Sequence, residues 1–197
     1  LHATVLNTLQ MILAVFHLFV HILSTRRQVP SRNWDLVLAV YLEEIFVRNA
    51  FAPRLYPVLL EQIKNLLESL DDENFSRRDP KTDKDMIGKT MKCFADVVHF
   101  LVASRVLDKE KSAAAGTPCQ LDDTAFRQDL MDVMFYVDAM MAKERPKWLL
   151  AVQTNTLKNI SEIFGIMSPV FSNADLGEIA RGFLESIPAR KKTTNML

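Results

Sequence analysis

Residues 84–107 read KDMIGKTMKCFADVVHFLVASRVL, and this stretch decides the fold class. Its apolar residues recur at intervals of three and four, which places them on one face of an α-helix. A strand would instead alternate apolar and polar residues at every second position. The stretch therefore predicts one long amphipathic helix. Its buried side is predicted to contain Met86, Ile87, Met91, Phe94, Val97, Val98, Leu101 and Val102.

The same helical pattern recurs along the chain of 197 residues, so that about seven helices are predicted. Prolines and polar segments separate them, and the sequence contains no Asn-Gly or Asp-Gly hairpin turn. Wide apolar faces without a fixed repeat period favour an armadillo- or HEAT-like α-solenoid over a closed four-helix bundle. The predicted fold is therefore all-α, an antiparallel helix stack. The other six helices are predicted at about 1–23, 34–48, 55–70, 123–143, 146–167 and 174–187.

The segments between these helices set the expected domain organisation. Residues 71–85 are polar and contain Pro80, which predicts a surface loop. Residues 108–122 lack periodicity and predict a flexible, partly disordered loop. We expect one armadillo-like helical domain over residues 1–189 and a basic, flexible tail over 190–197. Because the first residue is not Met and helical pattern begins almost at once, the chain is expected to be a fragment of a larger protein.

The first predicted helix resembles a membrane span in length and apolarity, because residues 1–23 contain no Asp, Glu, Lys or Arg. Its polar residues Asn7, Gln10, His17 and His21 nevertheless fall within a stripe of roughly 80°. This pattern predicts a mostly buried helix of a soluble core, with one narrow polar seam. The four-residue spacing of the two histidines could hold a metal, but Leu18 stands where a zinc-peptidase helix needs Glu. No metal site is predicted.

Composition and motifs argue against catalysis. Lys plus Arg and Asp plus Glu are equal at 24 each, so no overall field would attract nucleic acid or an acidic membrane. The sequence has no glycine-rich phosphate loop, no Cys-x-x-Cys pair and no Gly-x-Ser-x-Gly elbow. Glu43 and Glu44 are adjacent on a predicted helix, so their side chains point in different directions and cannot act jointly. They are predicted to lie on a solvated helix face. Cys93 and Cys119 are predicted to be free thiols in a reducing compartment. We expect no enzyme site and no cofactor.

Short basic clusters are the remaining candidates for a functional surface. They could contact an acidic partner or lipid headgroups if their loops share one edge of the stack, although loop solubility would explain them equally well. No aromatic residues interleave with them, which argues against single-stranded nucleic acid. A third cluster, at 190–192, lies in the tail. The residues of the first two clusters are Arg26, Arg27, Arg32, Arg77, Arg78, Lys81 and Lys84.

Short identities spread over most of the chain carry a family resemblance. They are clearest in residues 90–107, in the Leu-rich helix from Phe126 to the paired Met140 and Met141, and between residues 157 and 188. From Leu36 onward the sequence resembles the central armadillo-like region of the dedicator of cytokinesis (DOCK) family. Asp108 stands where relatives usually have an aromatic residue, and the following loop is longer, so a divergent member is expected.

The resemblance implies a role at the level of a parent protein. Family members are guanine-nucleotide exchange factors for Rac or Cdc42 GTPases in signalling to the actin cytoskeleton, in cell migration and in engulfment. In them a lipid-binding C2-like domain precedes this region, the exchange domain follows it, and some members bind an ELMO partner through an SH3 domain. The implied role is a non-catalytic scaffold in a cytoplasmic protein that is recruited to the plasma membrane. The sequence leaves one alternative open, a helical-repeat adaptor of an unrelated large complex.

Overall fold

The computed structural model describes residues 2–26, 32–50, 52–71, 80–143 and 147–187. Within these ranges the regular elements are helical and no strand occurs, which confirms the predicted all-α class. Short 3-10 turns flank the third α-helix, at Ala52–Arg54 and Ser69–Asp71. The eight described α-helices are α1 (His2–Arg26), α2 (Arg32–Val40), α3 (Leu55–Glu68), α4 (Pro80–Lys92), α5 (Phe94–Ala115), α6 (Asp123–Ala142), α7 (Lys147–Met167) and α8 (Asn173–Ser186).

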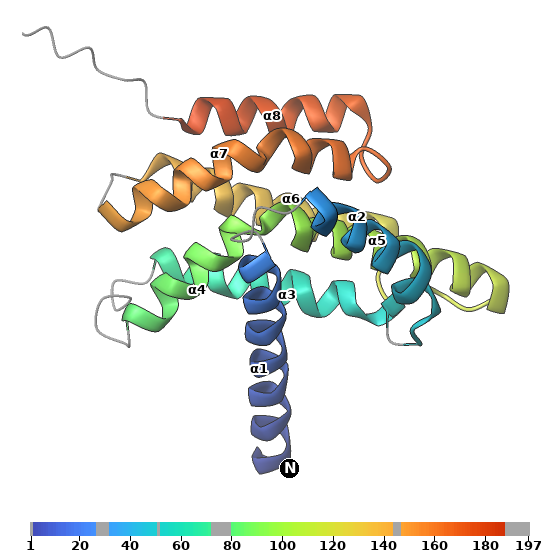
Figure 1. Cartoon of the computed structure of the whole chain (residues 1–197). Coiled ribbons are helices and arrows are strands. Elements are labelled where there is room, and N and C mark those ends of the chain that lie inside the picture. The colour runs from blue at the N-terminus through green and yellow to red at the C-terminus, as the bar shows by residue number, and fades with distance from the viewer. Residues whose placement is uncertain (1, 27–31, 51, 72–79, 144–146, 188–197) are drawn as a thin grey trace, which may run out of the picture.

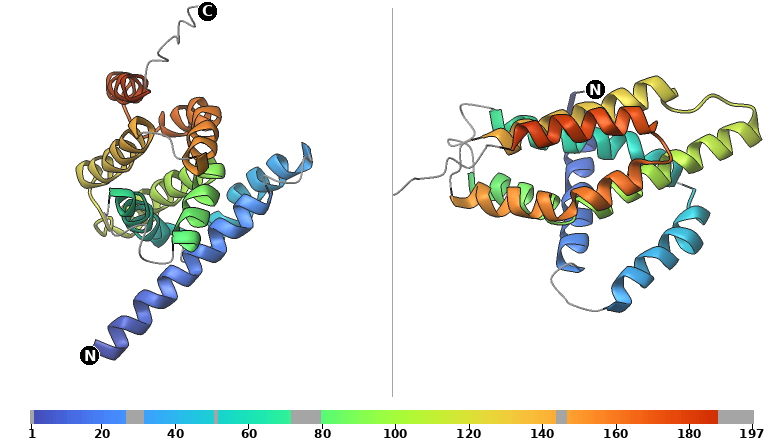
Figure 2. Two further views of the ribbon diagram at one scale, coloured as in Figure 1. Left: turned by 90° about the vertical axis from the view of Figure 1, so that its left-hand side faces the viewer. Right: turned by 90° about the horizontal axis from the view of Figure 1, so that it is seen from above.

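The helices form two columns that lie side by side. One column contains α3, α6 and α8 in that order, and the other contains α4 and α5 beneath α7 (Figure 2). The core between the columns includes large side chains that are fully buried, such as Phe94, Phe126 and Phe183. The α1 helix crosses the end of this stack at a steep angle and extends beyond it (Figure 1). The predicted helix stack is therefore confirmed.

The predicted helix at 84–107 is wrong in one respect, because it is divided at Cys93 into α4 and α5. Cys93 leaves the helical conformation, with φ −110° and ψ 23°. The break frees the carbonyl groups of Met91 and Lys92, and the amide of Asn159 on α7 donates to both, at 3.4 and 3.3 Å. Asn159, which is 67 and 68 positions away in the sequence, thus bonds to two carbonyl groups that would accept hydrogen bonds within the helix if the helix were continuous.

The predicted boundaries of both polar loops are also wrong. The α4 helix begins at Pro80, where the missing N–H of a first-turn proline has no cost. The α5 helix continues into the predicted loop as far as Ala115. It ends at Gly116, which has a left-handed backbone conformation with φ 64°. The side chains of Asp108 and Ser112 are buried. Residues 72–79 lie outside the described part of the chain.

The predicted second helix changes its geometry halfway. A π-helical turn covers Tyr41–Ile45 and a 3-10 turn covers Phe46–Arg48. Leu42 and Phe46 are buried, but Tyr41 and Ile45, which an ideal helical spacing would place on the same face, are exposed. The wide turn rotates the residues that follow it, so that an ideal helical spacing no longer applies.

The last three helices lie within one residue of their predicted bounds. Asp122 caps α6 by accepting a hydrogen bond from the N–H of Ala125 at 2.7 Å. Ser172 and Asp175 form a reciprocal capping box at the start of α8, although Asp is shorter than the usual Glu. The predicted tail at 190–197 lies outside the described residues.

Several helix ends are closed by side chains from a neighbouring helix. The Lys143 ammonium group after α6 donates to the carbonyl of Leu70 after α3, at 2.6 Å. Gln153 on α7 donates to the last carbonyls of α6, those of Met140, Met141 and Lys143. Because these bonds satisfy groups that a helix cannot satisfy itself, they fix each helix end against the next layer.

Candidate protein-docking surface

Exposed apolar side chains are concentrated at one end of the stack. Of the seventeen large apolar side chains that are exposed in the described part of the chain, eleven lie between Met11 and Val47. Isolated exposed apolar residues are normal on a soluble protein, but a concentration of this kind indicates an interaction surface. The eleven are Met11, Leu13, Val15, Leu18, Ile22, Leu36, Val37, Val40, Tyr41, Ile45 and Val47.

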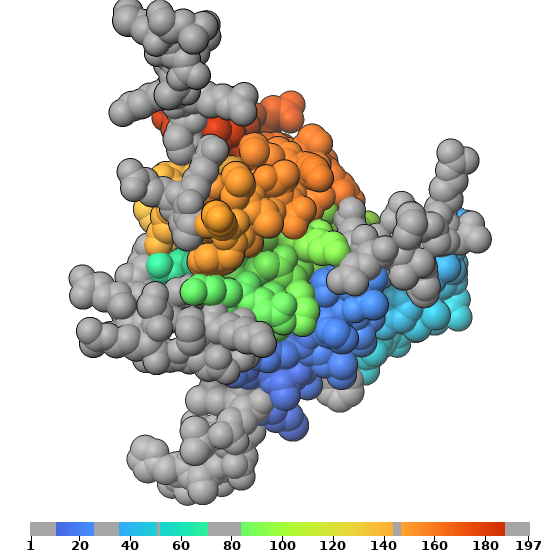
Figure 3. All heavy atoms as spheres, turned by 60° about the vertical axis from the view of Figure 1, so that its left-hand side comes forward, coloured from blue at the N-terminus to red at the C-terminus, as the bar shows by residue number. Residues whose placement is uncertain are grey.

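The α1 helix contributes a regular stripe to this surface. Met11, Val15, Leu18 and Ile22 are between 59% and 62% exposed, and at 100° per residue they lie within roughly 60°. The prediction that α1 is mostly buried is wrong. Its C-terminal half buries Phe16, Val20 and Leu23 against the stack, but the neighbouring helices α3, α4 and α5 lie on one side of it only. Figure 3 shows residues 11–25 of α1 in blue on the surface of the molecule.

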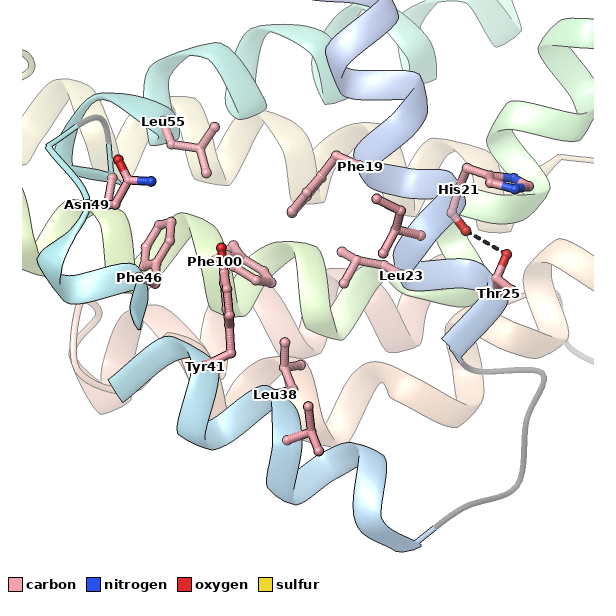
Figure 4. Close-up of a pocket in the computed structure, with 13 residues that line it drawn as sticks. Phe19, His21, Leu23, Thr25, Leu38, Tyr41, Phe46, Asn49, Leu55 and Phe100 are labelled. Carbon is pink, nitrogen blue, oxygen red and sulfur yellow. Dashed lines mark hydrogen bonds between the residues drawn. The ribbon is translucent and has the colours of Figure 1, made fainter. Parts of the chain in front are cut away.

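An apolar groove lies between α1 and α2 beside this stripe. Its volume is about 780 Å³, and its floor is Phe100 of α5. Phe19 and Phe46 pack edge-to-face on Phe100, with ring centroids 5.1 and 5.2 Å away (Figure 4). Apolar side chains of α1, α2 and the segment from Tyr41 to Leu55 complete the walls, and His21, Thr25 and Asn49 are the polar lining residues. The remaining lining residues are Ile22, Leu23, Val37, Leu38, Tyr41, Ala52 and Leu55.

The predicted basic clusters fall mostly outside what the structure describes. Arg27, Arg77 and Arg78 lie in segments that are not described, as does the cluster at 190–192, and the side chains of Arg26, Arg32 and Lys81 are not described either. Lys84 is on α4, where its ammonium group lies 5.6 Å from the centre of the Trp148 ring on α7. A basic surface shared by these residues therefore stays a prediction.

The other sequence candidates have structural positions. Glu43 and Glu44 are exposed, as predicted, and Glu44 pairs with Arg48 at 2.9 Å. The predicted free thiols are confirmed, with Cys93 buried and Cys119 partly exposed. Among the described residues no group of three or more His, Cys, Asp or Glu side chains could hold a metal.

None of the described helices is sufficiently long and apolar to cross a membrane, α1 included.

A buried polar network between α3, α5 and α6 was not predicted. The hydroxyl of Tyr56 donates to Asp108 at 3.0 Å and accepts from Arg105 at 3.2 Å and from the N–H of Leu121 at 2.9 Å. Burial is the main cause that raises the pKa of Tyr56. Arg105 also pairs with Asp123 at 2.9 Å. The only signal in the sequence was Asp108 at the end of an apolar run, and its partner is 52 positions away.

The outer faces of this network carry further charge pairs. Hydrogen bonds from Lys109 and Arg105 lower the pKa of Asp123. Lys64 of α3 bridges Asp129 and Asp132 of α6, at 3.1 and 3.0 Å. These contacts join helices of successive layers and none of them opens into the groove, so they stabilise the stack.

Asp138 of α6 has a partly buried carboxyl group at the contact with α8. One of its oxygens has no hydrogen-bond partner, and burial raises the pKa of Asp138 to about 6. A Cβ atom on Gly182 of α8 would come within 3.2 Å of the other oxygen. The close approach of the two helices therefore leaves this carboxylate with little room for water.

The fold and its exposed apolar end define a helical-repeat segment of the scaffold class. The sequence model of a family described as the dedicator of cytokinesis (DOCK) TPR region matches residues 5–197. The chain therefore belongs to the DOCK family. TPR and armadillo repeats are both stacks of helices, so the predicted architecture holds at that level. No curated protein and no solved structure matches the chain.

Proposed function

We propose that this chain is the helical scaffold segment of a guanine-nucleotide exchange factor that acts on Rac- or Cdc42-class GTPases. In this role it holds a lipid-binding C2-like domain and an exchange domain in a fixed relative geometry. The proposal is supported by the family match over residues 5–197. That match gives no support to an adaptor of an unrelated complex.

The physical basis of this role is the rigidity of the stack. Asn159 and Gln153 of α7 close helix ends in both columns, at the break after α4 and at the end of α6. Lys143 joins the ends of α6 and α3. A layer cannot slide past its neighbour without leaving buried carbonyl groups unsatisfied, which is costly. The interlocked helix ends are the observation that carries the proposal, because they would transmit position between the flanking domains.

The chemistry in this proposal belongs to other parts of the parent protein. The GTPase would bind the exchange domain, an ELMO-type adaptor would bind an SH3 domain, and the C2-like domain would recruit the cytoplasmic parent to the plasma membrane. The segment itself would contribute geometry to signalling in actin remodelling, migration and engulfment. It needs no cofactor and no nucleic acid for that role.

A nucleotide-exchange assay tests whether the exchange activity lies outside this chain. The isolated chain and the longer parent are incubated with Rac and with Cdc42, and the release of a fluorescent nucleotide is followed. We expect exchange by the parent and neither binding nor exchange by the isolated chain. Faster exchange with the isolated chain would contradict the scaffold role.

A second assay tests rigidity directly. In the parent, Gln153→Leu combined with Asn159→Leu removes both sets of α7 bonds, and Thr154→Ala on the exposed side of α7 is the matched control. We expect the double variant to keep its exchange rate in solution and to lose several-fold of the rate on vesicles that contain phosphatidylserine. Equal rates on vesicles for the double variant and the control would show that the stack does not set the geometry.

A further inference from the structure

Two dipeptides in the sequence consist of Ser or Thr followed by Pro, namely Thr117-Pro118 and Ser168-Pro169. The first lies between α5 and α6, and the second lies between α7 and α8. Protein kinases of the proline-directed class transfer phosphate to a Ser or Thr that proline follows. They bind their substrate as an extended strand with an accessible hydroxyl. The local backbone and the hydroxyl therefore decide which of the two dipeptides such a kinase can use.

The segment around Thr117 meets both requirements. The α5 helix ends at Gly116, and residues 117–119 have no regular secondary structure. A residue before proline is disfavoured in the helical region, so Pro118 favours an extended backbone at Thr117. Residues 113–118 are all exposed. The Thr117 hydroxyl has no hydrogen-bond partner among the described residues, so it is accessible for transfer.

The helix end before Thr117 can unwind without loss of packing. Residues 113–115 are alanines in the last turn of α5, and all three are exposed. Because this turn has no buried side chain to lose, it belongs to the parts of the molecule that open at low cost. The N–H of Thr117 is held by the carbonyl of Ser112 at 3.0 Å. Opening a single helical turn would therefore give a kinase several extended residues before Thr117.

Ser168 has the same dipeptide chemistry but a closed backbone. Its hydroxyl donates to the carbonyl of Gly165 at 2.8 Å, and its N–H donates to the same carbonyl at 3.4 Å. The N–H of Phe171 bonds back to the carbonyl of Met167 at 3.1 Å, and the side chain of Phe171 is buried. The segment is therefore a tight turn that is fixed to the stack, although Ser168 itself is exposed.

We propose that Thr117 is a phosphorylation site for a proline-directed protein kinase, and that the phosphate releases the loop between α5 and α6 from the stack. In the transfer the hydroxyl oxygen of Thr117 bonds to the γ-phosphorus of ATP. The bond from that phosphorus to the β–γ bridging oxygen breaks, ADP leaves, and the catalytic aspartate of the kinase accepts the hydroxyl proton. The inference does not depend on the proposed scaffold role, because it uses only this loop and its contacts.

A phosphate at Thr117 lies in an unfavourable electrostatic environment. It adds about two negative charges just after the carboxyl end of α5, where the helix dipole is also negative. The two lysines nearest in the sequence already have partners. Lys109 pairs with Asp123 at 3.0 Å. Lys111 donates to the carbonyl of Asn49 at 3.5 Å. The new charge is therefore expected to move the loop away from the end of α5.

The residues after Thr117 connect the loop to the interior of the stack. The N–H of Gln120 donates to the carboxylate of Asp108 at 3.0 Å. The N–H of Leu121 donates to the hydroxyl of Tyr56 at 2.9 Å. Both acceptors belong to the buried polar network between α3, α5 and α6. Displacement of the loop removes two donors from this network, and buried acceptors that lose their donors destabilise the fold.

Mass spectrometry of the whole chain tests the site. The chain is incubated with ATP, Mg²⁺ and a mitogen-activated protein kinase, and the phosphorylated residue is mapped. We expect phosphate on Thr117. The variant Thr117→Ala should lose it, and Ser168→Ala, the matched control, should keep it. Pro118→Ala is expected to slow the transfer by about ten-fold or more, because the kinase selects its substrate by the residue after Thr117.

Two synthetic peptides show whether the fold makes the selection. They cover residues 110–124 and 161–175, and both are expected to accept phosphate because neither dipeptide is then held by the stack. In the folded chain, absence of phosphate on Thr117 would overturn the proposal. Phosphate on Ser168 in place of Thr117 would also overturn it, since the turn at Ser168 would then be open to the kinase.

Hydrogen exchange of the phosphorylated chain tests the release of the loop. We expect the N–H groups of Gln120 and Leu121 to exchange several-fold faster than in the unmodified chain, because both leave their acceptors. The N–H of Asp175, which is bonded to the hydroxyl of Ser172 in α8, is the internal reference and should not change. Equal exchange at Gln120 and Leu121 in the two forms would overturn the proposed release.

Discussion

The two ends of the stack differ in the polarity of their outer faces. At one end α8 buries Ile179 and Phe183 and turns Glu178, Arg181 and Glu185 to solvent. Its one large exposed apolar side chain is Leu184. At the other end eleven such side chains are exposed between Met11 and Val47, eight of them on α1 and α2. Stacks of helical repeats need a polar outer face where they end. The α8 end has the character of a cap, and the α1 end has the character of an internal layer.

The largest effect expected from this contrast is on stability. Phe183 at the capped end is buried, whereas Leu18 at the open end is exposed. We expect Phe183→Ala to lower the free energy of unfolding by about 3–5 kcal/mol, because it leaves a cavity between α8 and α6. Leu18→Ala should change it by less than about 0.5 kcal/mol, because the side chain is already exposed. Urea unfolding followed by circular dichroism measures both, and equal effects would remove the contrast.

A smaller effect on stability is expected from the polar network in the interior of the stack, between its two ends. Tyr56→Phe removes the hydroxyl that meets Asp108, Arg105 and the N–H of Leu121. We expect a loss of about 1–3 kcal/mol, because buried polar groups lose their partner. Arg48→Ala, at an exposed pair, should cost under about 1 kcal/mol and is the control. Thermal unfolding distinguishes them, and a neutral Tyr56→Phe would mean that water replaces the hydroxyl.

The capped end is also expected to respond to pH. Burial raises the pKa of Asp138 to about 6 in the folded chain, above the ordinary value of 3.8 for this carboxyl group. The folded state therefore favours the protonated carboxyl: this contribution is fully present below the unfolded pKa and is lost as pH rises through about 6. We expect Asp138→Asn to be more stable than the original chain by about 1–2 kcal/mol at pH 7, allowing for partial solvent exposure.

The measurement for Asp138 is the difference in unfolding free energy between the variant and the original chain at several pH values. The difference should shrink as pH falls from above 6 toward 3.8. A difference that is constant with pH would show that the carboxyl does not titrate at the α6–α8 contact. Taking the difference cancels the opposite slopes of Asp123, Asp132 and Asp175, whose pKa values are lowered in the folded chain.

The smallest expected effect concerns the first turn of the cap itself. Ser172→Ala removes one half of the capping box of α8 and should cost about 1 kcal/mol. Hydrogen exchange is the sharper readout, because the N–H of Asp175 loses its acceptor. Faster exchange confined to the first turn of α8, with α1 unchanged, is the expected pattern. Equal acceleration in both helices would mean that the ends are not independent.

The sequence predicted those elements whose signals are local. The bounds of α6, α7 and α8 follow from Asp122, Ser172 and helical periodicity, all of which act within a few residues. The break at Cys93 and the ordered residues 108–115 could not be predicted, because Asn159 and Tyr56 stabilise them from distant positions. Periodicity also reports that a face is apolar but not whether a neighbour covers it, which is why α1 was expected to be mostly buried.

The candidate surface was missed for a related reason. Sequence patterns drew attention to clusters of charge, such as Arg77 and Arg78, which the structure does not describe. The groove instead combines Phe19, Phe46 and Phe100 from three separate segments, and each of them has the spacing of an ordinary core residue. Only their arrangement in space distinguishes a groove from a core.

The bonds that close helix ends across layers also bear on modularity. In a regular repeat array a pair of helices can be deleted, and the remainder loses only one interface. Here a chain shortened before residue 147 would lose Gln153 and Asn159 together, exposing the last carbonyls of α6 and the broken turn after α4 at once. Truncation would thus damage layers that remain in the product. Domain boundaries for expression, and insertion points for tags, should therefore lie outside the helices that exchange these bonds.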